Sequence, residues 1–205
     1  MNLDLPQLAA IAAAMGWASG LRLYAVVFIT GAAGFLGWVA LPSGLQLLQH
    51  PLVLSASFIM FVVEFVADKI PGVDTVWDAV HTVIRIPAGA ALAFGVLNGA
   101  LGVDGDTWAL LAALMGGTLA ATSHAAKATT RAAANTSPEP FSNLALSLAG
   151  DVAVPAMLWL AWQQPQWFWP VLAIALVLAL VVIVVLFKFL RALFRRFSPQ
   201  RAATA

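Results

Sequence analysis

Residues 64–85 read Glu64-Phe-Val-Ala-Asp68-Lys69-Ile-Pro71-Gly72-Val-Asp74-Thr-Val-Trp-Asp78-Ala-Val-His81-Thr-Val-Ile-Arg85. Seven of these side chains are ionisable, whereas the segments on either side are nearly all apolar. Charged groups at or near the depth of a bilayer are costly, so they usually face a protein interior or a wet cavity and often mark function. This stretch is therefore the first candidate for a functional site.

The composition of the chain is that of an integral membrane protein. Hydrophobic residues make up 62% and charged residues 9%, and the mean hydropathy is +0.93, whereas an ordinary soluble domain is roughly a quarter charged. Since a transmembrane helix needs about 20 residues, the chain has room for about six spans, or between five and seven. We expect an all-α, polytopic helical bundle that forms one domain over residues 1–190, followed by a basic tail at 191–205.

Six apolar blocks can be drawn, at residues 5–40, 51–67, 84–101, 107–134, 141–162 and 167–190. The first block is too long for one span and is interrupted by glycines and Arg22, which predicts a broken helix that forms either one tilted span or two short ones. Pro71-Gly72 predicts a second break, because proline lacks its N–H and glycine tolerates unusual dihedrals. A re-entrant or interfacial segment near residues 69–83 would follow from it.

The last block is followed by basic residues, at positions 188, 191, 195, 196 and 201. Lys and Arg near the ends of spans stay cytoplasmic, so the C-terminus is predicted to be cytoplasmic. The connections at 41–50, 102–106 and 163–166 then lie outside, and those at 68–83 and 127–140 lie inside. The N-terminus lies inside if the first block is one span and outside if it is two.

The acidic residues near Pro71 recur at helical spacing. Glu64 and Asp68 are one turn apart, Asp74 and Asp78 repeat this spacing, and His81 lies three residues further on. Carboxylates with an imidazole suit hard or borderline divalent cations, so candidate metal ligands are Glu64, Asp68, Asp78 and His81. The same residues fit a cation or proton transport site, or a cytoplasmic loop with salt bridges to Lys69, Arg85, Lys127 and Arg131.

A basic stripe follows in the fourth block. His124, Lys127 and Arg131 are spaced by three and four residues and so share one helix face. They either neutralise an anionic substrate or the acids of residues 64–78, or they extend to cytoplasmic lipid headgroups. Asn135 begins a proline-containing turn that leads into the fifth block.

Asp151 lies well inside the fifth block, where an unpaired charge is expensive. Arg22 is the other ionisable group at such depth, so we expect the two to pair. That pair serves either as a structural salt bridge or as part of a transport pathway.

Two motifs of this chain resemble a known bacterial membrane-protein family, domain of unknown function 4126. They are the run from Glu64 to Asp78 with His81, and His124-Ala-Ala-Lys127 together with Asn135-Thr-Ser-Pro-Glu139-Pro-Phe-Ser-Asn143. The resemblance covers roughly residues 8–162. It implies a multi-pass protein of the bacterial inner (plasma) membrane whose two motifs belong together, and it implies no reaction or substrate.

The leading hypothesis is a small inner-membrane transporter, channel or lipid-translocating protein with proton coupling through a carboxylate or His81. The expected partners are membrane lipids and a small ionic or zwitterionic substrate or lipid headgroup. The candidate site residues are Arg22, Glu64, Asp68, Asp74, Asp78, His81, Arg85, His124, Lys127, Arg131, Asn135 and Asp151.

Two other function classes fit the same residues. A membrane-embedded metal-dependent enzyme would use the carboxylates and His81, but the chain has only three histidines and no Gly-x-Ser-x-Gly motif, which argues against an enzyme. A non-transporting assembly subunit would use the clusters to hold helices together. The sequence requires no cofactor, leaves homo-oligomerisation open, and disfavours nucleic-acid binding because its short basic tail suits anionic lipids.

Overall fold

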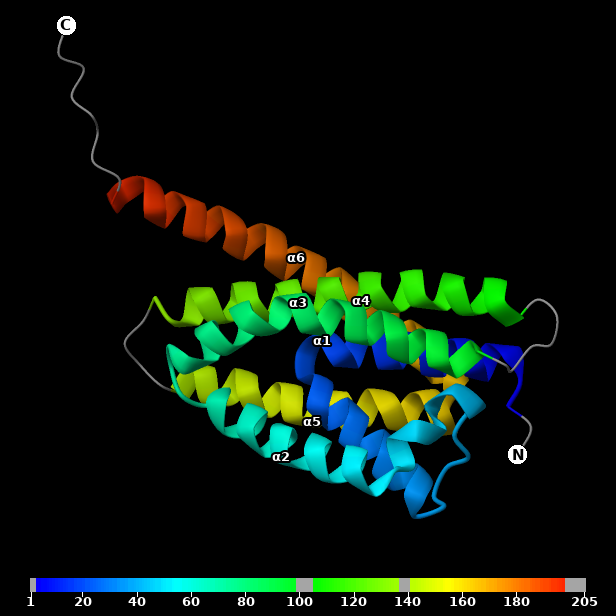
Figure 1. The fold of residues 1–205 in the computed structure, drawn as a ribbon. Helices are drawn as coiled ribbons and strands as arrows, with labels where there is room; N and C mark the ends of the chain where they lie inside the picture. Colours follow the sequence, from blue (N-terminus) through cyan, green and yellow to red (C-terminus); the bar gives the residue numbers. More distant parts are fainter. Residues whose placement is uncertain (1–2, 99–104, 137–140, 198–205) are drawn as a thin grey trace, which may run out of the picture.

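A computed structural model of the chain describes residues 3–98, 105–136 and 141–197. These residues form helices and no strand (Figure 1): α1 (Leu5–Phe35), the 3-10 helix η1 (Ser43–Gln49), α2 (Pro51–Ala67), α3 (Val73–Leu97), α4 (Gly105–Ala134), α5 (Phe141–Gln163) and α6 (Pro165–Phe197). Five helices are long and apolar enough to cross a membrane, and the bent pair η1 and α2 provides a sixth segment. The predicted polytopic helical bundle is therefore confirmed.

The first helix is broken at Arg22, whose φ of −147° and ψ of 81° are not helical. Thr30 Oγ1 lies 3.8 Å from Met15 Sδ, whereas these residues would be about 22 Å apart along a straight helix. The second half of α1 therefore folds back along the first, as Figure 1 shows.

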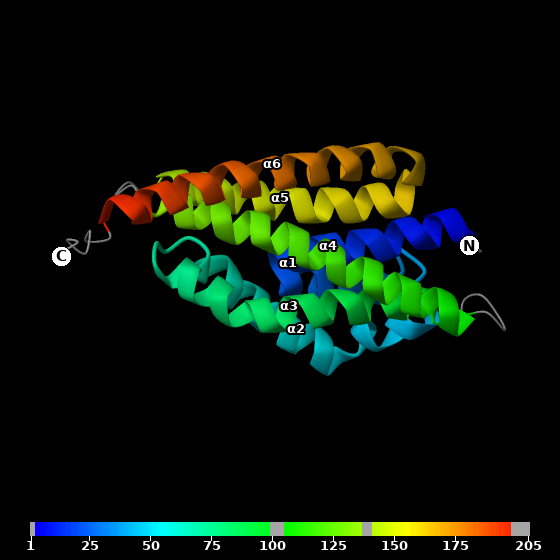
Figure 2. The ribbon, with the colours of Figure 1, turned by 90° about the horizontal axis from the view of Figure 1, so that it is seen from above.

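Both ends of α1 lie at the same end of the bundle. The Gln7 side chain donates to the carbonyl of Trp162, near the end of α5, and Ala33 and Trp38 line a cavity together with Trp162. Thus α1 is a helical hairpin with Arg22 at its tip, which realises the predicted broken helix as two short segments. The start of α1 and the C-terminal end of α6 lie at opposite ends of the bundle (Figure 2).

The separate re-entrant segment that the sequence suggested near residues 69–83 is instead the start of α3. This helix begins at Val73 and continues through Pro87 to Leu97, so the break is confined to residues 68–72, where Gly72 has a φ of +87°. The segment runs as a regular helix because Asp74, Asp78 and His81 are buried with polar partners. The element of this fold that turns back on itself is α1.

Three further boundaries bear on the predicted spans. Helix α6 extends to Phe197, so Lys188, Arg191 and Arg195 lie on helix rather than in a separate segment. Part of the predicted outer connection, at 99–104, and part of the proline-containing turn, at 137–140, lie outside the described residues. So does Arg201.

Small residues let α1, α3 and α4 approach one another closely. Gly16 of α1 faces Gly116 of α4, and Gly116 in turn faces Gly89 and Ala93 of α3. Small residues at helix interfaces in membranes allow such close backbone approach. The first half of α1 is therefore held in the centre of the bundle, with residues 10–15 fully buried.

The glycine contact predicts a contrast between two neighbouring substitutions. Gly116→Ala adds a methyl group that would overlap Ala93 and the Gly89 carbonyl, so we expect it to lower the free energy of unfolding by about 1–3 kcal/mol. Gly117→Ala is the matched control, because its added Cβ would lie at an ordinary 3.4 Å from Ala90 Cβ. Thermal unfolding in detergent should show a lower midpoint for Gly116→Ala alone. Equal midpoints for the two variants would contradict the packing.

The hairpin predicts which residues are accessible from which side. Because the chain has no cysteine, single cysteines can be labelled with a membrane-impermeant maleimide. The exposed positions Leu5 and Trp38 lie at and just beyond the two ends of α1, and the exposed Ile70 lies on the α2–α3 connection. This connection is at the opposite end of the bundle from the start of α1 (Figure 1). We expect Leu5→Cys and Trp38→Cys to react from the same side of a membrane vesicle and Ile70→Cys from the opposite side. Labelling of Leu5→Cys and Trp38→Cys from opposite sides would rule out the hairpin.

Candidate functional site

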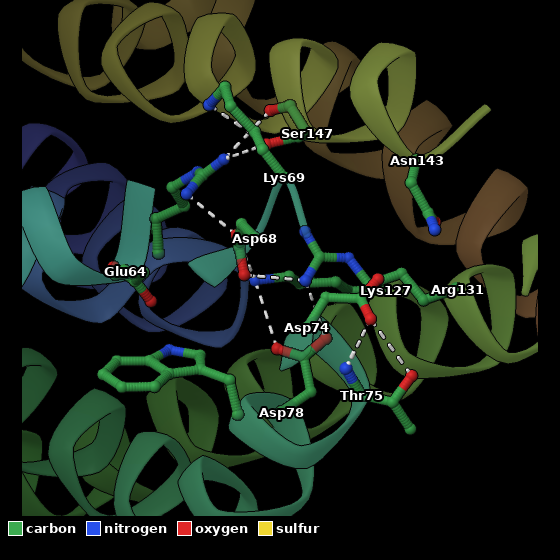
Figure 3. A network of polar contacts seen from close by, with 12 residues as sticks. Glu64, Asp68, Lys69, Asp74, Thr75, Asp78, Lys127, Arg131, Asn143 and Ser147 are labelled. Carbon is green, nitrogen blue, oxygen red and sulfur yellow. Dashed lines mark hydrogen bonds and ion pairs between the residues drawn. The ribbon is translucent and has the colours of Figure 1, made fainter. Parts of the chain in front are cut away.

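Charged side chains from helices α1 to α5 meet around the tip of the α1 hairpin. Asp68, directly after α2, is fully buried and contacts bases of both α1 and α4 (Figure 3). Its carboxylate lies 2.8 Å from Arg22 Nη1, 2.9 Å from Lys127 Nζ and 2.7 Å from Arg131 Nη1. Asp68 is therefore the centre of an ion-pair network.

The ionisation of Asp68 is fixed by this setting. Burial raises the pKa of Asp68, but the neighbouring Lys127, Arg131 and Arg22 lower it by more, so that its pKa lies well below the ordinary value of a carboxyl. Asp68 consequently stays charged at neutral and mildly acidic pH. It is not suited to take up and release a proton.

Asp78 of α3 is the second acid that binds several bases. Its Oδ1 lies 2.8 Å from Arg85 Nη1 and 3.2 Å from Lys127 Nζ, and its Oδ2 lies 3.2 Å from Arg131 Nη1. Arg85 also binds Glu64 of α2 at 2.7 Å, and both of these side chains are fully buried. The acids on either side of the Pro71-Gly72 turn are thus joined by the bases of α4.

Arg22 extends the network to α5. The expected pair with Asp151 is present at 2.8 Å, and Arg22 Nη2 also donates to the carbonyl and hydroxyl of Ser147 at 3.1 and 2.9 Å. Asp151 binds Lys69 in addition, at 3.0 Å. Arg22 therefore holds Asp68 and Asp151 together from the hairpin tip.

The break in α1 leaves backbone carbonyls that the same bases satisfy. Lys127 Nζ donates to the Leu21 carbonyl at 2.8 Å, and Arg85 Nη1 lies 3.5 Å from the Gly20 carbonyl. The last carbonyls of a helix lack intrahelical donors and carry the negative end of its dipole, so they favour cations. The network therefore stabilises the hairpin tip as well as the buried acids.

Two of the predicted site residues, Asp74 and Asn135, form a separate polar cluster at the end of α4. Asp74 accepts hydrogen bonds from the N–H groups of Gly72 and Thr75 at 2.8 and 2.7 Å and from Asn135 Nδ2 at 3.2 Å. Asn135 also accepts from Asn143 of α5. These contacts start α3 and join it to α4 and α5, beside the ion pairs.

The two histidines occupy fixed positions outside the ion pairs. His81 Nδ1 lies 2.8 Å from the Trp77 carbonyl, which only accepts, so we assign the proton to Nδ1 and let Nε2 accept from the Tyr24 hydroxyl at 3.2 Å. His124 Nδ1 accepts from Arg85 at 3.2 Å, which assigns its proton to Nε2. Both rings are held in place by these contacts.

The predicted metal ligands do not come together as a site. Among residues 3–98, 105–136 and 141–197, no three His, Asp or Glu side chains are grouped so that they could hold a metal ion. Glu64 and Asp78 bind Arg85, Asp68 binds its three bases, and His81 faces Tyr24 and Trp77. In this structure the three carboxylates are therefore bound by bases.

A cavity of about 270 Å³ lies against the network, between α1, α4, α5 and α6. At one end it is lined by three bases and one acid, Arg22, Lys127, Arg131 and Asp68, with the hydroxyls of Ser123, Thr130 and Ser147 nearby. The remaining wall is apolar and consists largely of small residues, including Ala149, Gly150, Ala153, Ala175 and Ala179. The charged side chains on this wall are thus three bases and one acid, and each base is already paired with carboxylates of the network.

Sequence reasoning missed several members of the site. Ser147 lies four residues before Asp151, so their shared helix face was a usable signal. Lys69 was considered only as a salt-bridge partner of the neighbouring acids, although it binds Asp151. The part of α6 that lines the cavity is apolar and gave no signal.

The chain matches one family model, described as a domain of unknown function (DUF4126), over residues 9–187. The chain belongs to this family. The match includes every residue of the ion-pair network and most of α6, beyond the extent of the resemblance seen in the motifs. No curated protein and no solved structure gave a match.

The network predicts a large cost for removing its central acid. Asp68→Asn leaves Arg22, Lys127 and Arg131 short of one buried negative charge, so we expect the free energy of unfolding to fall by about 3–5 kcal/mol. Asp106→Asn is the matched control, because Asp106 is exposed and its loss should cost less than about 1 kcal/mol. Unfolding of the purified proteins in detergent would measure both. A similar loss for the two variants would contradict a central role of Asp68.

Proposed function

We propose that the chain is a small membrane transporter whose Arg22, Lys127 and Arg131 bind an anionic or zwitterionic substrate. The observation that carries this proposal is the cavity, whose wall includes these three bases and their shared partner Asp68 inside an apolar bundle. Ionisable groups within a membrane are expensive and most often belong to substrate or ion pathways. A cavity bordered by three bases is suited to an anionic group once one of their carboxylate partners withdraws.

Asp68 acts in this proposal as the resident anion that the substrate replaces. It lies on the short connection between α2 and α3 rather than within a helix, so movement of this turn would withdraw the carboxylate. The three bases would then bind the substrate, and return of Asp68 would release it. Because Asp68 stays charged, any proton coupling has to use another group, such as Asp78, Glu64 or His81.

The broken helix supports the same proposal. Small transporters commonly place their substrate site at discontinuous helices near the bilayer midplane, and Arg22 lies both at the break of α1 and on the cavity wall. If the basic end of α6 is cytoplasmic, as the positive-inside rule indicates, α1 enters from the outer side of a bacterial inner membrane. The hairpin tip then reaches the site from outside, and the α2–α3 turn reaches it from the cytoplasm.

The alternative is a non-transporting assembly subunit. It is favoured by the fact that Glu64, Asp68, Asp78 and Asp151 each already have a basic partner. Such a closed network can serve packing alone. The two functions differ in whether the protein moves a solute.

Transport predicts a flux that depends on Lys127. In proteoliposomes offered inorganic phosphate, short carboxylates, phosphocholine and fluorescent anionic lipids, we expect flux of at least one class. Lys127→Ala should lower this flux at least tenfold, because it removes a base from the cavity. Lys188→Ala is the control, since Lys188 is exposed on α6, and should leave flux within twofold.

A thermal unfolding scan of both variants separates lost flux from lost folding. If no member of the panel is transported, or if the flux is unchanged in Lys127→Ala, the transporter proposal is wrong and the assembly subunit is favoured.

A further inference from the structure

The cavity next to the ion pairs has two chemically different parts. The three bases, Asp68 and three hydroxyl side chains gather at one part, whereas the wall formed by α5 and α6 carries apolar side chains. A small water-soluble anion would gain nothing from the apolar wall, because burying a polar group without partners is unfavourable. A ligand with an apolar portion would match it.

This apolar part reaches the outer surface of the bundle. Ala149 of α5 and Leu178 of α6 both line the cavity and are exposed on the surface that the apolar helices present to lipid. Figure 1 shows α6 diverging from the other helices toward its C-terminal end. A ligand can therefore reach the bases laterally from the bilayer, between α5 and α6.

Small side chains create the space along this route. Ala149, Gly150 and Ala153 form the α5 side, and Ala175 and Ala179 form the α6 side. The volume of about 270 Å³ lies just below the roughly 300–1,000 Å³ typical of small-molecule sites. It suits a headgroup with the beginning of a chain, while the rest of the chain would remain in the bilayer.

We infer that the ligand of this cavity is a membrane amphiphile, with an oxyanion headgroup held by Arg22, Lys127 and Arg131 and a hydrocarbon tail that leaves between α5 and α6. The inference rests on the proposed function and narrows its substrate class to lipids with an acidic headgroup. When Asp68 withdraws as proposed above, an oxyanion headgroup accepts charge-assisted hydrogen bonds from the three bases in its place. Its tail packs along the alanine-lined wall and continues into the bilayer.

The test uses three probes that separate head from tail. Dioleoyl phosphatidic acid has both parts, dioleoylglycerol lacks the phosphate, and inorganic phosphate lacks the tail. Each is titrated into the full-length protein in maltoside micelles while the unfolding midpoint is followed. We expect phosphatidic acid to raise the midpoint with at least tenfold higher apparent affinity than either of the others.

Two variants of α6 locate the binding. Ala179→Phe fills the apolar part without touching a charge, and should weaken phosphatidic acid binding at least tenfold. Ala173→Phe, the same change on the exposed face of α6 and outside the cavity lining, should leave it within twofold. Equal effects of the two variants, or none, would place the lipid elsewhere and overturn the inference.

The remaining outcomes distinguish the inference from the proposed function. If inorganic phosphate binds as tightly as phosphatidic acid and Lys127→Ala abolishes both, the inference of an amphiphilic ligand is wrong, and the proposed binding of an anion is retained. If dioleoylglycerol binds equally well, the headgroup contributes nothing and the inference fails. If none of the three probes binds, the inference fails, and transport is then decided by the flux of Lys127→Ala alone.

Discussion

Helices α1 and α4 and the α2–α3 connection converge in this fold around one buried carboxylate that needs several bases. Asp68 has no exposed surface and is held within 3 Å by Arg22 of α1 and by Lys127 and Arg131 of α4. Withdrawing such charges from water costs several kcal/mol each, and only close ion pairs with further hydrogen bonds offset this cost. The positions of the hairpin tip, the α2–α3 turn and the cavity all follow from this convergence.

The helical hairpin depends on the same contacts. Irregular backbone at membrane depth persists only where protein or water satisfies its polar groups. Here Lys127 and Arg85 approach the carbonyls of Leu21 and Gly20, while Gly16 and Gly116 bring the first half of α1 against α4. The bases of α4 and α3 thus support both the charge of the acids and the break in the helix.

Sequence patterns predicted the members of the network better than its geometry. The pairing of Arg22 with Asp151 was predictable because each is a lone charge in an apolar block, and the meeting of Asp68 with Lys127 followed from charge. The hairpin was not decided by sequence, since a block at residues 5–40 has the length for either one span or two. Its course depends on Gly16 facing Gly116, a contact between residues far apart in the chain.

Two other features were missed for related reasons. Pro71-Gly72 suggested an interfacial segment, whereas α3 begins as a helix at Val73. The carboxylates of Glu64, Asp68 and Asp78 together with His81 suggested a metal site, whereas bases of α1, α3 and α4 bind these three carboxylates. The cavity depends on Ala175 and Ala179 of α6. The sequence of α6 is apolar on all sides over this part, so it does not show which face lines a cavity and which faces lipid. In both cases the role of a side chain depends on the residues that pack against it in the fold, and the sequence does not show these contacts.

A double-mutant cycle between Arg22 and Asp68 tests the central ion pair most directly. Arg22→Gln, Asp68→Asn and the double variant would be unfolded in detergent, and their free energies of unfolding compared with that of the parent protein. A direct buried contact predicts a coupling energy of about 1–3 kcal/mol, so that the double variant loses less than the sum of the single variants. Losses that add within about 0.5 kcal/mol, the behaviour of distant sites, would contradict the pairing on which the hairpin tip and the cavity depend.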